Sequence, residues 1–371
     1  MRVGVPKEIK VLENRVGLTP ASVREFVAQG HSVLVEHDAG IGIGLADDAY
    51  RAAGAQIAAD AGEVFAQAEM IVKVKEPQAA ECARLQPGQI LFTYLHLAPD
   101  PEQARGLIAS GAVCIAYETV TSPRGGLPLL APMSEVAGRM AVQAGAFLLE
   151  KPHGGKGILL GGVPGVAPGK VAIIGGGVVG THAAMIALGM GADVTVLDRN
   201  PEVLAALWKQ FGPALKTEFS THDAIERHVA RADLVVGGVL IPGASAPKLV
   251  SAAMIRKMQQ GSVVVDVAID QGGCFETSRP TTHAEPTYVV DGVVHYCVAN
   301  MPGGVPRTST FALNNATLPF ALALAGKGWK RALAEDPHLR DGLNIAYGKV
   351  TCQPVAEALG YDYVEPHNVM E

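Results

Sequence analysis

Residues 170–198 combine an apolar strand, a glycine turn, a helix and a second apolar strand that ends on an acidic residue. The sequence there is KVAIIGGGVVGTHAAMIALGMGADVTVLD, with the pattern GxGxxG at Gly175, Gly177 and Gly180. A unit of this kind predicts a β-α-β crossover that binds a dinucleotide, and therefore parallel strands in an α/β sheet.

Each glycine of this turn meets a separate requirement of dinucleotide binding. Gly175 permits the tight turn, Gly177 lets the backbone approach a pyrophosphate, and Gly180 allows close packing of helix on strand. The N-terminus of the helix that follows the turn offers N–H donors and the positive end of its dipole to the phosphates.

The acidic residue at the end of the second strand indicates which dinucleotide binds. The Asp198 carboxylate can accept both ribose hydroxyls and would repel a 2′-phosphate, which favours NAD. The neighbouring Arg199 is the residue that would favour NADP instead.

Length and charge narrow the class of protein. A chain of 371 residues is too long for one core, so we expect two domains. The net charge of −6 argues against a nucleic-acid partner.

The chain shows no targeting or metal signal. The start, MRVGVPKEIK, lacks the apolar stretch of a signal peptide, and the apolar run 171–192 is explained by the glycine turn rather than by a membrane span. Five cysteines without CxxC spacing fit a reduced, cytoplasmic protein, and no ligand cluster predicts a metal.

The pattern before the glycine turn predicts another α/β domain. Apolar runs separated by helical stretches suggest a largely parallel sheet, with strands at 3–5, 32–35, 70–74, 90–94 and 112–117. After Asp198, alternating helices and strands complete a doubly wound sheet, at 201–211, 216–220, 222–232, 234–239, 251–258, 263–267 and 294–298.

Two long helices are expected to join these Rossmann-like domains. One covers Ser134–Glu150 with Ser134 as its N-cap, and the other covers Thr308–Ala325, broken or kinked near Pro319. We therefore expect a discontinuous substrate domain (1–128 and 306–371), an NAD-binding domain (129–305), and a cleft between them.

Polar residues just after predicted strands are the candidates for chemistry. In the first domain these are Lys75 and His96, with Arg15 in the loop after the first strand, and in the second domain Asp270. The spacing alone leaves each of them open to a structural role. Lys73 is as available as Lys75, whereas Asp266, inside its strand, reads as structural.

The whole chain resembles the alanine dehydrogenases. The motifs that carry the resemblance follow one another in the family's order: PKEIKVLENRVGLTP, VKVKEP, FTYLHLA, LAPMSEVAGRMA, GGVPGV, GGGVVG, DVAIDQGG and YCVANMPGGVPRTST. One departure is Val203, where a basic residue near the adenosine is expected.

The resemblance implies a role for each candidate. Arg15 and Lys75 would hold the substrate, Tyr94 and Met133 would line its pocket, and His96 and Asp270 would be the catalytic acid/base groups. Besides the glycine turn, Val178 and Asp270, the residues implied to contact the nucleotide are Ser134, Asp198, Ser220, Val239, Leu240, Val267, Arg279, Val298, Asn300 and Met301.

The implied reaction is the reversible conversion of L-alanine, NAD⁺ and water to pyruvate, ammonium and NADH, in a cytoplasmic homohexamer. Which of His96 and Asp270 acts as the base in each step stays open. Two alternatives are the NAD-binding component of a transhydrogenase and a saccharopine-type dehydrogenase. The substrate set of Arg15, Lys75 and His96 argues against the first. The motifs KVKEP and FTYLHLA, with the small pocket implied by Tyr94 and Met133, argue against the second.

Overall fold

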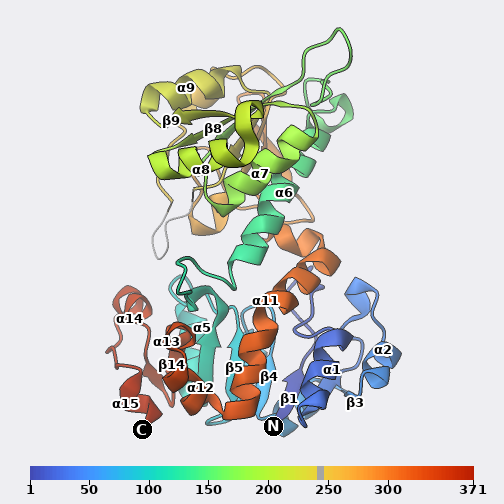
Figure 1. The fold of residues 1–371 in the computed structure, drawn as a ribbon, viewed down its shortest axis with the longest axis vertical. Helices are drawn as coiled ribbons and strands as arrows, with labels where there is room; N and C mark the ends of the chain where they lie inside the picture. The colour runs from blue at the N-terminus through green and yellow to red at the C-terminus, as the bar shows by residue number, and fades with distance from the viewer. Residues whose placement is uncertain (240–245) are drawn as a thin grey trace. The chain divides into compact units, whose positions relative to one another are not determined.

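The computed structural model describes residues 1–239 and 246–371 and divides the chain into two compact units (Figure 1). Unit 1 comprises Met1–Met133 and Val305–Glu371, and unit 2 comprises Ser134–Gly304. Each unit is an α/β layer structure around its own sheet.

The sheet of unit 1 has the strand order β15-β14-β6-β5-β4-β1-β2-β3. The pairings from β6 to β3 are all parallel, whereas β14 and β15 pair antiparallel at the edge. The strands are β1 (Arg2–Val5), β2 (Ser32–Glu36), β3 (Gln56–Ala58), β4 (Met70–Val72), β5 (Ile90–Thr93), β6 (Val113–Ala116), β14 (Leu343–Ala346) and β15 (Lys349–Val350).

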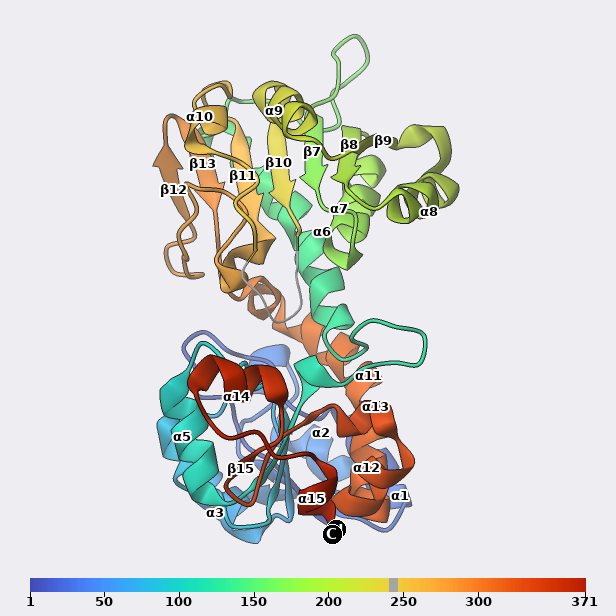
Figure 2. The same ribbon diagram turned by 90° about the vertical axis from the view of Figure 1, so that its left-hand side faces the viewer.

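Helices cover both faces of this sheet, with α3 and α5 on one side and α1, α12 and α13 on the other (Figure 2). The helices of unit 1 are α1 (Pro20–Ala28), α2 (Asp47–Ala52), α3 (Ala61–Gln67), α4 (Ala79–Cys82), α5 (Pro101–Ser110), α11 (Pro306–Lys327), α12 (Trp329–Glu335), α13 (Pro337–Arg340), α14 (Gln353–Leu359) and α15 (His367–Met370).

The sheet of unit 2 has the order β12-β13-β11-β10-β7-β8-β9, and all its pairings are parallel except that of β12 with β13. The strand order therefore reverses between β7 and β10. The strands are β7 (Lys170–Ile174), β8 (Asp193–Asp198), β9 (Lys216–Phe219), β10 (Leu234–Gly237), β11 (Val263–Asp266), β12 (Thr287–Val290) and β13 (Val293–Tyr296).

Two separate apolar cores lie on the two faces of the unit 2 sheet, as a doubly wound fold requires. Helices α6, α7 and α8 cover one face, and α9 and α10 cover the other. Their bounds are α6 (Ala131–Leu148), α7 (Val178–Gly189), α8 (Pro201–Phe211), α9 (His222–Arg231) and α10 (Ala252–Ile255). The predicted fold class, with two Rossmann-like α/β domains, is confirmed.

Local sequence signals explain where several helices begin. Thr19, Asp100 and Asn200 each accept a backbone N–H of the following first turn, and each precedes a proline at the first helical position. Proline is tolerated there because its missing N–H has no partner within the helix anyway.

Some predicted bounds are wrong. Helix α6 begins at Ala131, so Ser134 lies inside it and is not its N-cap. Helix α11 runs unbroken through Pro319, and α10 ends at Ile255 rather than Met258. Packing overrides a local signal in α11, where residues on both sides of the proline, such as Leu313 and Leu324, are buried.

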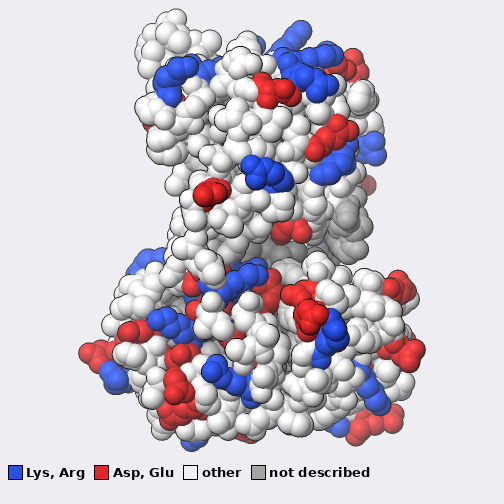
Figure 3. Space-filling view, turned by 180° about the vertical axis from the view of Figure 1, so that it is seen from behind, with Lys and Arg blue, Asp and Glu red and all other residues white. Residues whose placement is uncertain are grey.

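Acidic and basic side chains alternate over the face of each unit drawn in Figure 3, without a large area of one sign. Among the described residues, no helix is both long and apolar enough to cross a bilayer.

The glycine turn of unit 2 is built by one very close backbone approach. Gly175 has φ of 97°, which side chains disfavour, and a Cβ added to Gly180 would lie 1.8 Å from the Gly175 carbonyl oxygen. A Cβ added to Gly177, in contrast, would meet no atom within 4 Å. Gly180 is therefore needed for packing, whereas Gly177 leaves space in front of the turn.

We predict that Gly180→Ala lowers the free energy of unfolding by about 1–3 kcal/mol or more, because α7 must move away from β7. Gly177→Ala is the matched control and should change stability by less than about 1 kcal/mol. Denaturant unfolding of both variants tests this. Equal destabilisation by the two substitutions would contradict it.

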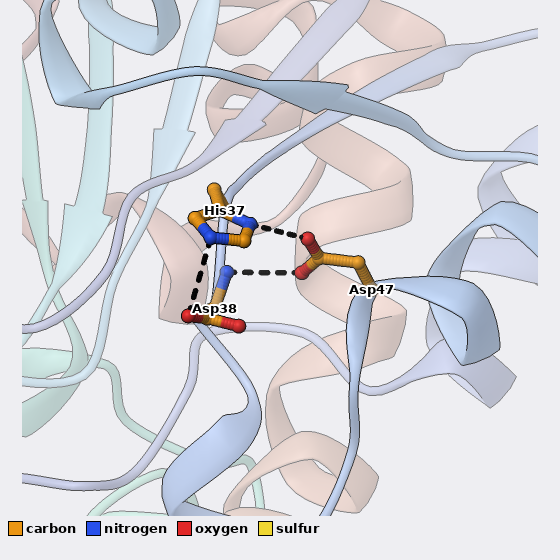
Figure 4. Close-up of side chains that lie close together, drawn as sticks. All are labelled: His37, Asp38 and Asp47. Atoms are coloured by element: carbon orange, nitrogen blue, oxygen red, sulfur yellow. Dashed lines mark hydrogen bonds and ion pairs between the residues drawn. The ribbon is translucent and has the colours of Figure 1, made fainter.

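In unit 1, a small charged cluster joins the end of β2 to the start of α2. His37 Nδ1 lies 2.6 Å from Asp47 Oδ2, and His37 Nε2 lies 3.3 Å from Asp38 Oδ2 (Figure 4). The hydrogen bond to Asp47, with the charges of Asp38 and Asp47, raises the pKa of His37. Burial would raise the pKa of Asp47, but the contacts with His37 and the Asp38 N–H outweigh it and lower that pKa.

These shifts predict a pH window for the stabilisation by this cluster. The His37 contribution is full below about pH 6.5 and is lost as the pH rises through the raised pKa, and the Asp47 contribution is full above about pH 4. His37→Gln should therefore destabilise the protein more at about pH 5.5 than at about pH 9 in urea unfolding. His367→Gln, at an exposed histidine, is the control. The same loss at both pH values would refute the window.

Candidate active site and nucleotide-binding turn

The carboxyl ends of three neighbouring parallel strands gather the candidate residues of unit 1. Arg15 lies in the loop after β1, Lys75 follows β4, and Tyr94 and His96 follow β5. Because these strands run in the same direction, their ends meet at one edge of the sheet.

Arg15 is buried and held by a neighbouring acid. Its Nε and Nη2 donate to the two Glu13 carboxylate oxygens at 2.7 and 2.6 Å, and its Nη1 lies 3.2 Å from Met133 Sδ. The Arg15 side chain is 2% exposed, and this bidentate pair orients its guanidinium. Of the predicted pocket residues, Met133 thus directly contacts Arg15.

Lys75 and His96 both approach one carboxylate, that of Glu76. Lys75 Nζ lies 2.9 Å and His96 Nε2 3.9 Å from Glu76 Oε1, while Lys10 Nζ lies 2.9 Å from Glu76 Oε2. Burial would raise the pKa of Glu76, but Lys75, His96 and Lys10 outweigh it and lower the pKa to about 2. Glu76 is therefore an anion that balances the positive charge of this edge.

The imidazole of His96 lies against an aromatic ring and near a second carboxylate. The rings of His96 and Tyr94 are nearly parallel, 4° apart, with centroids 5.6 Å apart. Tyr94 is fixed in turn, since its hydroxyl donates to the Leu129 carbonyl at 2.5 Å. Glu118 Oε1 lies 3.8 Å from His96 Nδ1 and accepts the His96 backbone N–H at 2.6 Å.

The structure separates the two lysines that the sequence left equivalent. Lys73 is fully buried, with its Nζ 3.0 Å from Glu8 Oε2 and 2.7 Å from Glu81 Oε1. The Lys75 side chain, by contrast, is 14% exposed, at the carboxyl end of β4. Lys73 therefore pairs with acids in the core of unit 1 and has a structural role. Lys75 is the more exposed of the two lysines and is the candidate for ligand binding.

In unit 2, the glycine turn lies where the strand order reverses, between β7 and β10, which is where open α/β sheets bind ligands. Asp198 ends β8, and its carboxylate accepts the N–H of Gly176 at 2.6 Å and that of Asn200 at 2.8 Å. The open space at Gly177 and the N-terminus of α7 suit a diphosphate. Val203 packs near Gly176, as a Cβ there would lie 2.7 Å from it.

Most other predicted nucleotide contacts also follow the carboxyl ends of strands in this sheet. Ser220 follows β9, Val239 follows β10, Val267 and Asp270 lie in the 3₁₀ turn after β11, and Val298, Asn300 and Met301 follow β13. Arg279 precedes β12 and stacks on Tyr288, 4.1 Å from the ring centroid. Ser134 lies on α6, and Leu240 is outside the described residues.

Asp266 is buried and accepts hydrogen bonds from the Cys274 N–H at 3.0 Å and from Ser278 Oγ at 2.6 Å. It therefore holds the loop that follows Asp270, in agreement with the structural role predicted for it.

Sequence reasoning missed the acidic residues that surround the cations. Glu13 and Glu76 lie in the same motifs as Arg15 and Lys75 and were overlooked. Glu118 directly follows the predicted strand 112–117, so the rule that selected Lys75 and His96 would have selected it too.

Among the described residues, one group has the spacing of metal ligands: His37, Asp38 and Asp47, with candidate ligand atoms within 4.8 Å of one another (Figure 4). Both imidazole nitrogens approach carboxylates, so the contacts are accounted for as ion pairs, and we assign no metal to them.

Comparison with known proteins covers nearly the whole chain. The family model "Alanine dehydrogenase/PNT, N-terminal domain" matches residues 4–137, and "Alanine dehydrogenase/PNT, C-terminal domain" matches residues 141–353. A protein named alanine dehydrogenase from Halomonas elongata is 63% identical over 98% of both chains. Another from Bacillus subtilis is 57% identical over 100% of this chain and 98% of the relative.

Solved structures agree with this assignment. One named L-alanine dehydrogenase shares 53% identity, with a TM-score of 0.94 over 97% of this chain and 99% of the other. A transhydrogenase from Sinorhizobium meliloti shares the fold, with a TM-score of 0.83 over 95% of this chain and 100% of the other, at 24% identity. The chain therefore belongs to the alanine dehydrogenase/PNT family.

Proposed function

We propose that the protein is an L-alanine dehydrogenase that interconverts L-alanine and pyruvate with NAD⁺ as the hydride acceptor. The observation that carries the proposal is the gathering of a guanidinium, an ammonium and an imidazole at one edge of the unit 1 sheet. The similarity to alanine dehydrogenases over the full chain supports it.

Arg15 and Lys75 suit a small 2-oxo acid. In this proposal Arg15 binds the substrate carboxylate, while Glu13, already paired with Nε and Nη2, keeps the guanidinium in place. Lys75 acts as a point charge that stabilises negative charge on the carbonyl oxygen as it develops. Because Glu76 is ionised, the ammonium keeps a counterion when the substrate leaves.

His96 is the group suited to proton transfer in unit 1. The amine of alanine must be neutral before hydride can leave, and later steps add water to the iminium and release ammonia. Imidazole exchanges protons near neutral pH, which suits these steps. Asp270, in unit 2, is the second acid/base candidate of this proposal.

The residues of the glycine turn would hold the NAD. The space at Gly177 and the N–H groups at the start of α7 would receive the pyrophosphate, and Asp198 would accept the adenosine ribose hydroxyls. The remaining contacts expected from the resemblance, together with a homohexamer in the cytoplasm, are part of this proposal.

The test is oxidation of NADH by the purified protein with pyruvate and ammonium, followed by nicotinamide absorbance. We expect turnover with pyruvate. Glyoxylate and 2-oxoglutarate, each tested in place of pyruvate, show which sizes of 2-oxo acid the pocket accepts. A transhydrogenase-type component would bind NADH without consuming pyruvate, and a saccharopine-type enzyme would require 2-oxoglutarate and an amino acid.

In this assay we predict that His96→Ala and Asp270→Asn each lower kcat by about 10² or more, the usual weight of an acid–base group. Circular dichroism should show both variants folded. Near wild-type turnover by either variant would remove that residue from the mechanism.

Asp198→Ala should weaken NADH binding and relax discrimination against NADPH, because the ribose acceptor and the negative charge are both lost. Steady-state kinetics with both cofactors measure the preference. Arg199→Ala is the matched control at the next residue and should leave NADH favoured. An unchanged cofactor preference in Asp198→Ala would refute the role of this carboxylate.

A further inference from the structure

His96 has a backbone conformation that L-amino acids rarely adopt. Its φ is 46°, in the left-handed region, although it is not glycine. It is one of five described non-glycine residues with positive φ, and the one among them that belongs to the candidate site. Such a conformation persists where the surrounding structure holds it in place.

The carboxylate of Glu118 supplies that hold. It accepts the His96 N–H at 2.6 Å on Oε1 and the Leu95 N–H at 3.2 Å on both oxygens. Two successive N–H groups that converge on one anion form the concave arrangement known as a nest. Glu118 reaches them from the turn after β6, the strand that pairs with β5, in register at Thr93 and Ala116.

The side chain of His96 is not hydrogen-bonded to either nearby acid. Its Nδ1 is 3.8 Å from Glu118 and its Nε2 is 3.9 Å from Glu76, both beyond hydrogen-bond distance. The ring is therefore oriented by its backbone and by the parallel Tyr94 ring. A change of φ at this residue would redirect the imidazole.

We propose that Glu118 is a positioning residue that aims the His96 imidazole by clamping the backbone N–H groups of residues 95 and 96. The catalytic consequence rests on the proposed function, but the clamp itself does not. In Glu118→Gln, one side-chain oxygen could still accept a backbone N–H. The other oxygen would be replaced by an N–H₂ group, which is itself a donor and cannot accept a backbone N–H, so even this conservative change weakens the clamp.

The first experiment measures kcat and KM separately for the full-length protein. Glu118→Gln and Glu118→Ala should lower kcat, the alanine variant by up to about 10²-fold, the scale expected for a misplaced catalytic group. KM for pyruvate should change by less than about twofold, since Arg15 and Lys75 keep their own partners. An unchanged kcat, or a loss confined to KM, would overturn the positioning role.

Glu76→Gln is the matched control, because Glu76 flanks the same imidazole but pairs with the Lys75 and Lys10 side chains instead of the His96 backbone. It should raise KM for pyruvate. If it reproduced the Glu118 variants in every measurement, general loss of negative charge near His96 would explain the data and the clamp would be rejected.

The second experiment tests the clamp by protein stability, a measurement that does not depend on catalysis. When the clamp is removed, histidine can relax from positive φ and recover part of the lost stability, whereas glycine at residue 96 has almost no strain to release. Glu118→Ala should therefore lower the denaturant midpoint in both backgrounds, but clearly less in the wild type than in His96→Gly, a coupling measured by a double-mutant cycle. Equal losses in both backgrounds would overturn the proposal.

The cycle still tests the clamp if a variant does not fold or if the protein does not turn over pyruvate. If Glu118→Ala does not fold, Glu118→Gln takes its place in the same cycle, with the same expected sign. If the wild-type protein does not turn over pyruvate, the proposed function fails while the coupling still decides the clamp.

Discussion

Parallel pairing of β4, β5 and β6 is the constraint on which the candidate site of unit 1 depends. Three chain segments far apart in sequence end at the same edge of the sheet, so Lys75, His96 and Glu118 become neighbours without any local sequence relation. The same rule operates in unit 2, where the glycine turn and Asp198 follow adjacent strands. In both units the sheet core is apolar, and most candidate residues lie at the carboxyl ends of the strands or in the loops beyond them.

Charge balance is the second constraint, and acids supply it. Arg15 is paired with Glu13, Lys75 with Glu76, and the buried Lys73 with Glu8 and Glu81. Burying an unpaired cation would cost several kcal/mol, so each positive group carries its own acid. These acids also keep the cations in fixed orientations, as the proposed binding of a small carboxylate substrate would require.

Sequence patterns predicted much of the architecture because they are local. Alternating apolar runs and helices with N-caps set most bounds within a residue or two, as in α5 and α8, and the GxGxxG turn lies at its expected place. The strand-end rule also identified Arg15, Lys75 and His96 as polar groups at one edge. What it left open, the choice between Lys73 and Lys75, is decided by burial, a property that depends on packing.

By itself the sequence determined the α/β class, the nucleotide turn and the candidate cations, since each follows from residue spacing along a few turns of chain. Only the tertiary structure decided that α11 continues through Pro319 and that the final strands β14 and β15 extend the first sheet. It alone brought the Glu118 carboxylate to the His96 backbone N–H, because that contact joins residues 22 positions apart that follow two different strands. Contacts of this kind arise from strand order and register, which no local pattern of side chains specifies.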